Sequence, residues 1–129
     1  MKKRTFFKVG LAALSLGLAA LLPKWAFAKK YGVALSKVPA LKKVGGAVTI
    51  RLADTDLLLI RISKEEVRGF NAVCTHQSCP VAFKQNEIVC DCHHSHFDLT
   101  GKVKHGPATK SLKTIPVALD GERIIVGDL

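Results

Sequence analysis

Cys74-Thr75-His76-Gln77-Ser78-Cys79-Pro80 is followed, after residues 81–89, by Cys90-Asp91-Cys92-His93-His94-Ser95-His96-Phe97-Asp98. All four cysteines and four of the five histidines of the 129-residue chain lie in these two stretches. Such a density of sulfur and imidazole groups predicts a metal site, a disulfide or both.

The spacing of cysteines and histidines within the two stretches distinguishes between several possible kinds of site. Disulfides alone would leave the histidines unexplained. A c-type haem requires Cys-x-x-Cys-His, and Val89 stands where the first cysteine would be. Structural zinc sites usually space paired ligands by two to four residues, whereas one residue separates Cys74 from His76. A structural zinc module is therefore an alternative that the spacing disfavours.

A 2Fe–2S cluster with two unequal irons fits the pattern best. Two thiolates hold one iron of such a cluster and two imidazoles hold the other, so each stretch must supply one cysteine and one histidine. Cys74-x-His76 and Cys90-x-x-His93 meet that requirement. Neutral imidazoles in place of two thiolates also raise the reduction potential.

The segments CTHQSC and CDCHHS resemble the two cluster-binding boxes of high-potential Rieske proteins, usually CTHLGC and CPCHGS. Gly106-Pro107-Ala108 resembles the proline-containing loop that covers the cluster in that family. The resemblance extends over roughly residues 37–129, and within the family the chain resembles the iron–sulfur subunit of quinol–cytochrome c oxidoreductases.

The resemblance implies a role for each of nine residues. The implied roles are inner-iron ligands (Cys74, Cys90), outer-iron ligands (His76, His93), a disulfide pair (Cys79, Cys92), a hydroxyl that bonds a bridging sulfide (Ser95), an aromatic position beside a ligand sulfur (Phe97) and the covering loop (Pro107).

Five positions depart from the family pattern. Phe97 stands where a tyrosine often donates a hydrogen bond, and phenylalanine has no donor. Asp91 replaces a proline and is expected to add negative charge beside the cluster. Gln77 replaces a shielding leucine, while Ser78 and His94 replace glycines. We therefore expect a positive midpoint potential that is lower than in relatives with both the serine and the tyrosine.

Three further histidines are predicted to be solvated loop residues: His94, His96 and His105. His93 is preferred as the ligand because, among the histidines of the second stretch, it alone completes Cys-x-x-His.

The rest of the chain has the hydrophobic pattern of short strands. Residues 48–52 alternate apolar and polar side chains, which is the period of a half-buried strand. Other strands are predicted at 57–62, 67–73, 112–119 and 123–126, and hairpins at 84–87 and Asp120-Gly121. The sequence predicts a small all-β domain, an antiparallel sandwich or barrel with a loop-rich cluster-binding subdomain.

Residues 1–28 have the order of an export signal: a basic start, an apolar run and Ala26-Phe27-Ala28. Residues 3–8 resemble the twin-arginine consensus, with Lys3 in place of the first arginine. The apolar run at 9–22 is shorter than the roughly 20 residues that span a bilayer, so cleavage after residue 28 is favoured over a retained anchor helix. Residues 29–36 are predicted to be a linker, and the protein to lie on the periplasmic side of the inner membrane.

The formal charge is +10, and residues beyond 28 keep 15 basic and 10 acidic side chains. The basic residues are scattered and no nucleic-acid-binding motif is present, which disfavours nucleic acid as a partner. The resemblance implies one-electron transfer within a quinol-oxidising complex, with a cytochrome b and a c-type cytochrome as partners and possible membrane association. Two alternatives are a small subunit of a periplasmic molybdenum oxidase, as in arsenite oxidation, and a stand-alone periplasmic carrier.

Overall fold

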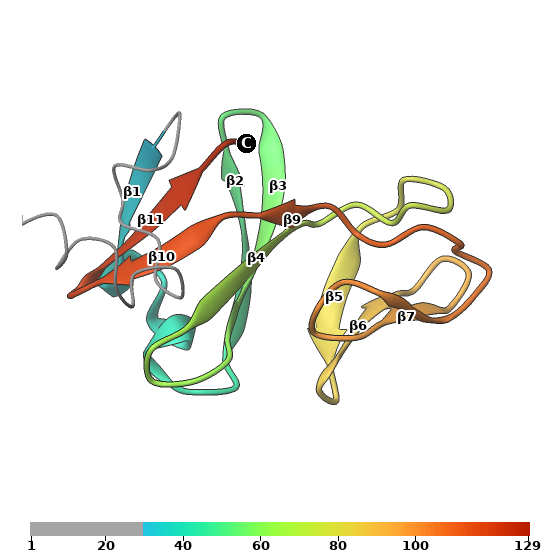
Figure 1. The fold of residues 1–129 in the computed structure, drawn as a ribbon, viewed down its shortest axis with the longest axis horizontal. Coiled ribbons are helices and arrows are strands. Elements are labelled where there is room, and N and C mark those ends of the chain that lie inside the picture. Colours follow the sequence, from blue (N-terminus) through green and yellow to red (C-terminus); the bar gives the residue numbers. More distant parts are fainter. Residues whose placement is uncertain (1–29) are drawn as a thin grey trace, which may run out of the picture.

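The computed structural model describes residues 30–129, and these form three antiparallel sheets (Figure 1). The predicted all-β antiparallel fold is therefore confirmed. The strands are β1 (Lys30–Ala34), β2 (Ala47–Leu52), β3 (Thr55–Arg61), β4 (Val67–Asn71), β5 (Val81–Lys84), β6 (Glu87–Cys90), β7 (Ser95–Phe97), β8 (Val103–His105), β9 (Thr114–Ile115), β10 (Val117–Asp120) and β11 (Arg123–Gly127), with short 3₁₀ helices η2 (Leu35–Lys37) and η3 (Pro39–Lys42).

Two of the sheets form a scaffold for the third. Their strand orders are β1-β11-β10 and β2-β3-β4-β9, and the third sheet has the order β5-β6-β7-β8. Figure 1 shows β5–β7 at one end of the molecule and β1 and β11 at the other. The second cysteine- and histidine-bearing stretch lies in the third sheet and the first leads directly into it, so we call it the cluster-binding sheet.

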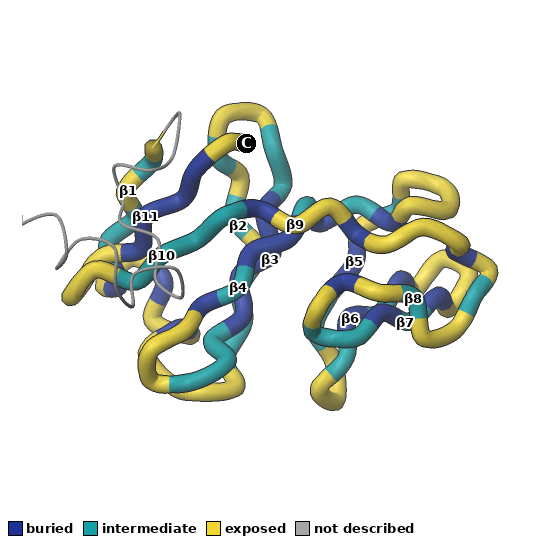
Figure 2. Tube along the Cα trace, in the orientation of Figure 1, coloured by how far each residue is buried: buried dark blue, intermediate teal, exposed yellow. Residues whose placement is uncertain are grey.

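Strand β3 is buried on both faces and joins two hydrophobic cores. Leu57 and Leu59 belong to the scaffold core, which also contains Ile124. Leu58 and Ile60 point the opposite way, as alternate residues of a strand must, and belong to the cluster-side core. Burial on both faces explains why the sequence of β3 is a continuous apolar run, and Figure 2 shows the buried positions along it.

The linker predicted for residues 29–36 is wrong for the part that the structure describes. Residues 30–34 form β1, which pairs with β11 so that Tyr31 lies opposite Val126 and Val33 opposite Ile124. Tyr31 and Val33 pack against the scaffold core. Two apolar residues in alternation are too short a pattern to predict a strand, and the pairing with β11 supplies the stabilisation.

The strand predicted for residues 112–119 is divided into β9 and β10 at Pro116. Proline has no N–H to donate to a neighbouring strand. β9 pairs with β4, whereas β10 pairs with β11, so the interruption moves the chain from one scaffold sheet to the other.

The export signal or anchor helix predicted for residues 1–28 lies outside the described residues. Among residues 30–129, no helix has the length and apolar character needed to cross a membrane.

Candidate metal centre

Two loops of the cluster-binding sheet carry the candidate centre. The first follows β4, and its ends are joined by a bridge between Val73 and Pro80. The second connects β6 to β7, starting from the pair Cys90 and Ser95. Val81, the first residue of β5, pairs with Cys90, so both loops leave the same end of the sheet.

Both loops use the same backbone turn. The Ser78 N–H donates to the Cys74 carbonyl at 2.9 Å, and the His94 N–H donates to the Cys90 carbonyl, also at 2.9 Å. Ser78 and His94 adopt left-handed conformations, with φ of 59° and 64°. These are the two positions where the family usually has glycine, the residue for which this conformation is least strained. In this chain serine and histidine therefore adopt a left-handed conformation that glycine would adopt with less strain.

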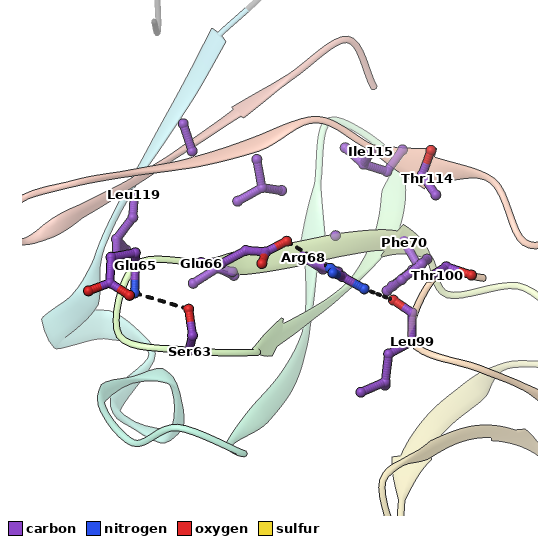
Figure 3. A pocket seen from close by; sticks show the side chains of 14 residues that line it. Ser63, Glu65, Glu66, Arg68, Phe70, Leu99, Thr100, Thr114, Ile115 and Leu119 are labelled. Carbon is purple, nitrogen blue, oxygen red and sulfur yellow. Dashed lines mark hydrogen bonds and ion pairs between the residues drawn. The ribbon is translucent and has the colours of Figure 1, made fainter. Parts of the chain in front are cut away.

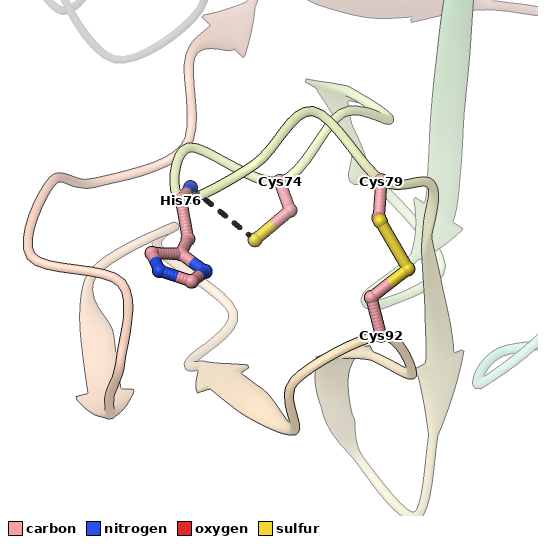
Figure 4. The surroundings of a disulfide bond; sticks show 4 residues. All are labelled: Cys74, His76, Cys79 and Cys92. Carbon is pink, nitrogen blue, oxygen red and sulfur yellow. Dashed lines mark hydrogen bonds between the residues drawn. A yellow bond between two sulfur atoms is a disulfide. The ribbon is translucent and has the colours of Figure 1, made fainter.

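A disulfide joins the two loops (Figure 4). Cys79 and Cys92 are bonded, which confirms the predicted pairing. Closing a loop of this kind, with a sequence separation of 13, stabilises a fold by about 3 kcal/mol. The sulfurs of Cys79, Cys90 and Cys92 lie within 4.8 Å of one another, but the disulfide removes two of them as thiolate ligands. Cys74 and Cys90 are the free thiols, and both are buried.

The two predicted histidine ligands lie together and are exposed. The ring centroids of His76 and His93 are 5.1 Å apart, with the rings perpendicular. The His76 backbone N–H lies 3.4 Å from the Cys74 sulfur, a contact suited to a thiolate. Two buried thiols and two exposed imidazoles are the unequal donor set that a cluster with one inner and one outer iron requires. The donor chemistry therefore fits a 2Fe–2S group of this kind.

A third loop covers the two stretches. The Ala108 N–H donates to the Ser95 hydroxyl oxygen at 3.0 Å, and Ser95 is fully buried. The Thr75 hydroxyl donates to the Lys110 carbonyl at 2.7 Å, which ties the first loop to the same segment. Pro107 is exposed and directly precedes the first of these attachments, at Ala108. Neither the Thr75 contact nor the Ala108 contact is evident from the sequence, since each joins a side chain to a backbone group of a distant segment.

Phe97 and Asp91 have different surroundings. Phe97 is fully buried in the cluster-side core that also contains Cys74 and Cys90. Asp91 is exposed and lies 2.7 Å from the Lys84 ammonium, whose hydrogen bond holds the pKa of that carboxyl below its ordinary value. The ammonium offsets the negative charge that Asp91 was expected to add beside the cluster.

The solvated-loop prediction is confirmed for His94 and wrong for the other two histidines. His94 is an exposed turn residue. His96 lies in β7 and His105 in β8, where they pair with each other across the sheet. Strands of three residues are too short to show an alternating pattern, so the sequence did not predict them.

A groove on the scaffold lies away from this centre. It has a volume of about 700 Å³ and runs between β4 and the β9–β10 segment (Figure 3). Arg68 crosses it, donating to the Leu99 carbonyl and pairing with Glu66. No cysteine or histidine lines it, so it is not part of the candidate centre.

Comparison with known proteins gives a family match and a set of relatives. The model of the family described as "Rieske [2Fe-2S] domain" matches residues 31–116. The chain is 36% identical over 99 residues to the cytochrome b6-f complex iron-sulfur subunit 1 of Nostoc sp. strain PCC 7120, covering 73% of this chain and 55% of the relative. It is 31% identical over 91 residues to the cytochrome bc1 complex Rieske iron-sulfur subunit of Corynebacterium efficiens, covering 63% of this chain and 22% of the relative. The chain thus spans little more than half of the first relative's length.

A solved structure shares the fold over most of this chain. The plasma membrane Rieske protein PetC3 of Synechocystis PCC 6803 superposes with a TM-score of 0.62 at 25% identity. The superposition covers 76% of this chain and 99% of that protein. The shared fold therefore extends over most of this chain and nearly all of that protein.

Proposed function

Since the chain belongs to the Rieske [2Fe-2S] domain family, we propose that it is the iron–sulfur subunit of a quinol-oxidising cytochrome complex. The family and the relatives establish a protein that carries one 2Fe–2S cluster and transfers electrons. The proposed partners are a cytochrome b, beside which quinol is oxidised, and a c-type cytochrome that receives the electron.

The proposed ligands are Cys74 and Cys90 for the inner iron and His76 and His93 for the outer iron. Burial of the two thiols and the 5.1 Å contact of the two rings support this assignment. When bound, the group accepts and releases one electron at a time. The exposed imidazoles of His76 and His93 form the surface that meets a partner, and the disulfide and the covering loop hold them in place.

The observation that carries the proposal is this exposed pair of imidazoles at the end of the cluster-binding sheet. A donor molecule can reach His76 and His93 without any movement of the scaffold, since both are exposed. The names of two relatives, subunits of b6-f and bc1 complexes, support cytochrome partners.

We also propose that the domain works on the exported side of the inner membrane. The disulfide between Cys79 and Cys92 supports this location, because disulfides persist in oxidising compartments. Residues 1–28 would supply the export signal or the anchor.

The proposal can be tested with membranes from cells that lack this chain. Purified, full-length, cluster-loaded protein is added in the oxidised state, followed by a short-chain quinol. We expect the cluster to be reduced only when membranes and quinol are both present, with c-type cytochrome reduced afterwards. Reduction that requires a molybdenum oxidase, or that proceeds with soluble donors and never with quinol, would contradict the proposal.

A matched pair of variants locates the contact. Gln77 is exposed in the first loop, between the proposed ligand His76 and the disulfide, and Gln85 is exposed in the hairpin at the far end of β5. We expect Gln77→Glu to slow quinol-linked reduction several-fold and Gln85→Glu to leave it unchanged. Equal rates in the two variants would place the donor contact elsewhere.

A further inference from the structure

A second group of histidines and charges lies on the cluster-binding sheet and has no part in the proposed function. Glu87, His96 and His105 come from three adjacent strands, β6, β7 and β8, and Lys104 is beside them. The four residues line a shallow surface depression of about 380 Å³. We call them the Glu87 cluster. Phe97, which follows His96 in β7, is buried on the opposite face of the cluster-binding sheet.

The two histidines of the Glu87 cluster have the geometry of an imidazole pair. Their residues are opposite each other in the β7–β8 ladder. Their ring centroids are 5.9 Å apart with an interplanar angle of 89°, close to the 5.1 Å and 89° of His76 and His93. His105 is exposed, so its ring can turn toward His96 to bring the two nitrogens within reach of one ion.

The carboxylate of Glu87 orients one of these rings. Its Oε1 lies 2.8 Å from His96 Nδ1. A carboxylate that accepts from Nδ1–H leaves the lone pair on Nε2, which is the arrangement found behind metal-binding histidines. The hydrogen bond from His96 also holds the pKa of Glu87 below its ordinary value, so the group is anionic at neutral pH.

We propose that His96 and His105 bind a divalent transition-metal ion that prefers imidazole ligands, of the Zn²⁺ class, with Glu87 as the carboxylate that orients His96. Imidazole nitrogen is a common ligand for Zn²⁺, Cu²⁺ and Ni²⁺, and water completes the coordination. Lys104 opposes binding, because its ammonium lies 3.4 Å from the other Glu87 oxygen and repels a cation. The inference does not depend on quinol oxidation.

The test is calorimetric titration of Zn²⁺ into the full-length protein with its cluster loaded, so that Cys74 and Cys90 are not available to zinc. We expect one site in the wild type and at least a tenfold loss of affinity in His96→Ala and in His105→Ala. Glu87→Gln should weaken binding about 10- to 100-fold, as loss of such carboxylates usually does. The matched control is His94→Asn, which removes an exposed imidazole outside the Glu87 cluster from a backbone position that asparagine tolerates.

Lys104→Gln supplies a measurement that misfolding cannot imitate, since we expect it to raise zinc affinity several-fold. Iron content and visible absorbance of each variant verify that the cluster is retained. Wild-type zinc affinity in either histidine variant, loss of binding in His94→Asn, or no gain in Lys104→Gln would overturn the inference.

Discussion

Ser95 is a fully buried polar residue whose hydroxyl oxygen already accepts a hydrogen bond, from the Ala108 N–H at 3.0 Å. That contact leaves the hydroxyl hydrogen to donate elsewhere. Cys90, its partner in the β6–β7 ladder, is a proposed ligand, so the hydroxyl lies beside the proposed centre. Hydrogen bonds to cluster sulfurs favour the reduced state, because they stabilise the added negative charge.

We therefore expect Ser95→Ala to lower the midpoint potential by roughly 50–100 mV. This is the equivalent of about 1–2 kcal/mol for one electron, which lies within the range spanned by neutral and charge-assisted hydrogen bonds. Voltammetry of the loaded protein measures the change. Thr109→Ala removes an exposed hydroxyl from the covering loop and is the control. An unchanged potential in Ser95→Ala would show that the hydroxyl has no bond to the cluster.

Phe97→Tyr should have the opposite effect. Phe97 packs in the core that contains both proposed thiolate ligands, so a phenolic O–H there gains a thiolate as a hydrogen-bond acceptor. We expect a higher midpoint potential, measured in the same way. A lower or unchanged potential in a folded variant would show that the added hydroxyl does not reach a ligand sulfur.

Between β7 and β8 the chain turns around the carboxylate of Asp98. One oxygen, Oδ1, accepts from the Thr100 hydroxyl at 2.6 Å, from the Thr100 N–H at 2.8 Å and from the Lys102 N–H at 3.1 Å. These donors, first of all the Thr100 hydroxyl, hold the pKa of Asp98 below its ordinary value. The ionised carboxylate thus stabilises the turn that leads to the covering loop.

For Asp98→Asn we expect lower stability than the wild type at neutral pH. An unperturbed aspartate titrates near pH 4, so the stabilisation by a carboxylate with a depressed pKa is fully present above about pH 4 and is lost as the pH falls through the folded-state value. The difference in unfolding free energy between the two proteins should therefore shrink in acid. Denaturant unfolding at several pH values measures it, and a constant difference down to pH 2 would contradict the assignment.

The sequence predicted those elements whose signals lie in neighbouring residues, such as turn residues between two strands. The Asp120-Gly121 turn between β10 and β11 and the hairpin of β5 and β6 are where the turn residues placed them. It did not predict β1, which depends on β11, almost ninety residues away in the sequence. The short strands β7 and β8 were missed for a similar reason, since the ladder with β6 defines them. The four proposed ligands could be predicted because coordination of a cluster requires particular residue types at particular spacings. The contacts of the covering loop could not, because they depend on backbone groups that any residue carries.

At the scale of the whole molecule, residues 30–129 form two hydrophobic cores: one stabilises the scaffold, and the other packs beneath the cluster-binding sheet. Ile124 is fully buried in the scaffold core, and Ile88 is fully buried in the cluster-side core with Cys74 and Cys90. Removal of either side chain should cost about 2–5 kcal/mol of stability. Only the loss of Ile88 opens space beside the proposed thiolate ligands.

Ile88→Ala should therefore lose its cluster faster on warming and shift its midpoint potential. Ile124→Ala should be destabilised to a similar degree and keep the wild-type potential. Measurements of iron release and of midpoint potential by voltammetry on both variants test whether only the cluster-side core affects the cluster. Equal potential shifts in the two variants would show that the cores act as one.

We propose that two imidazoles and two thiolates hold one cluster at the end of this fold. The decisive experiment for this coordination is pulsed electron paramagnetic resonance of the reduced, full-length protein, produced with ¹⁵N-labelled histidine. We expect strong coupling of the unpaired electron to two histidine nitrogens, from His76 and His93. A spectrum without histidine coupling, as an all-cysteine centre would give, or a protein without iron and inorganic sulfide, would contradict it.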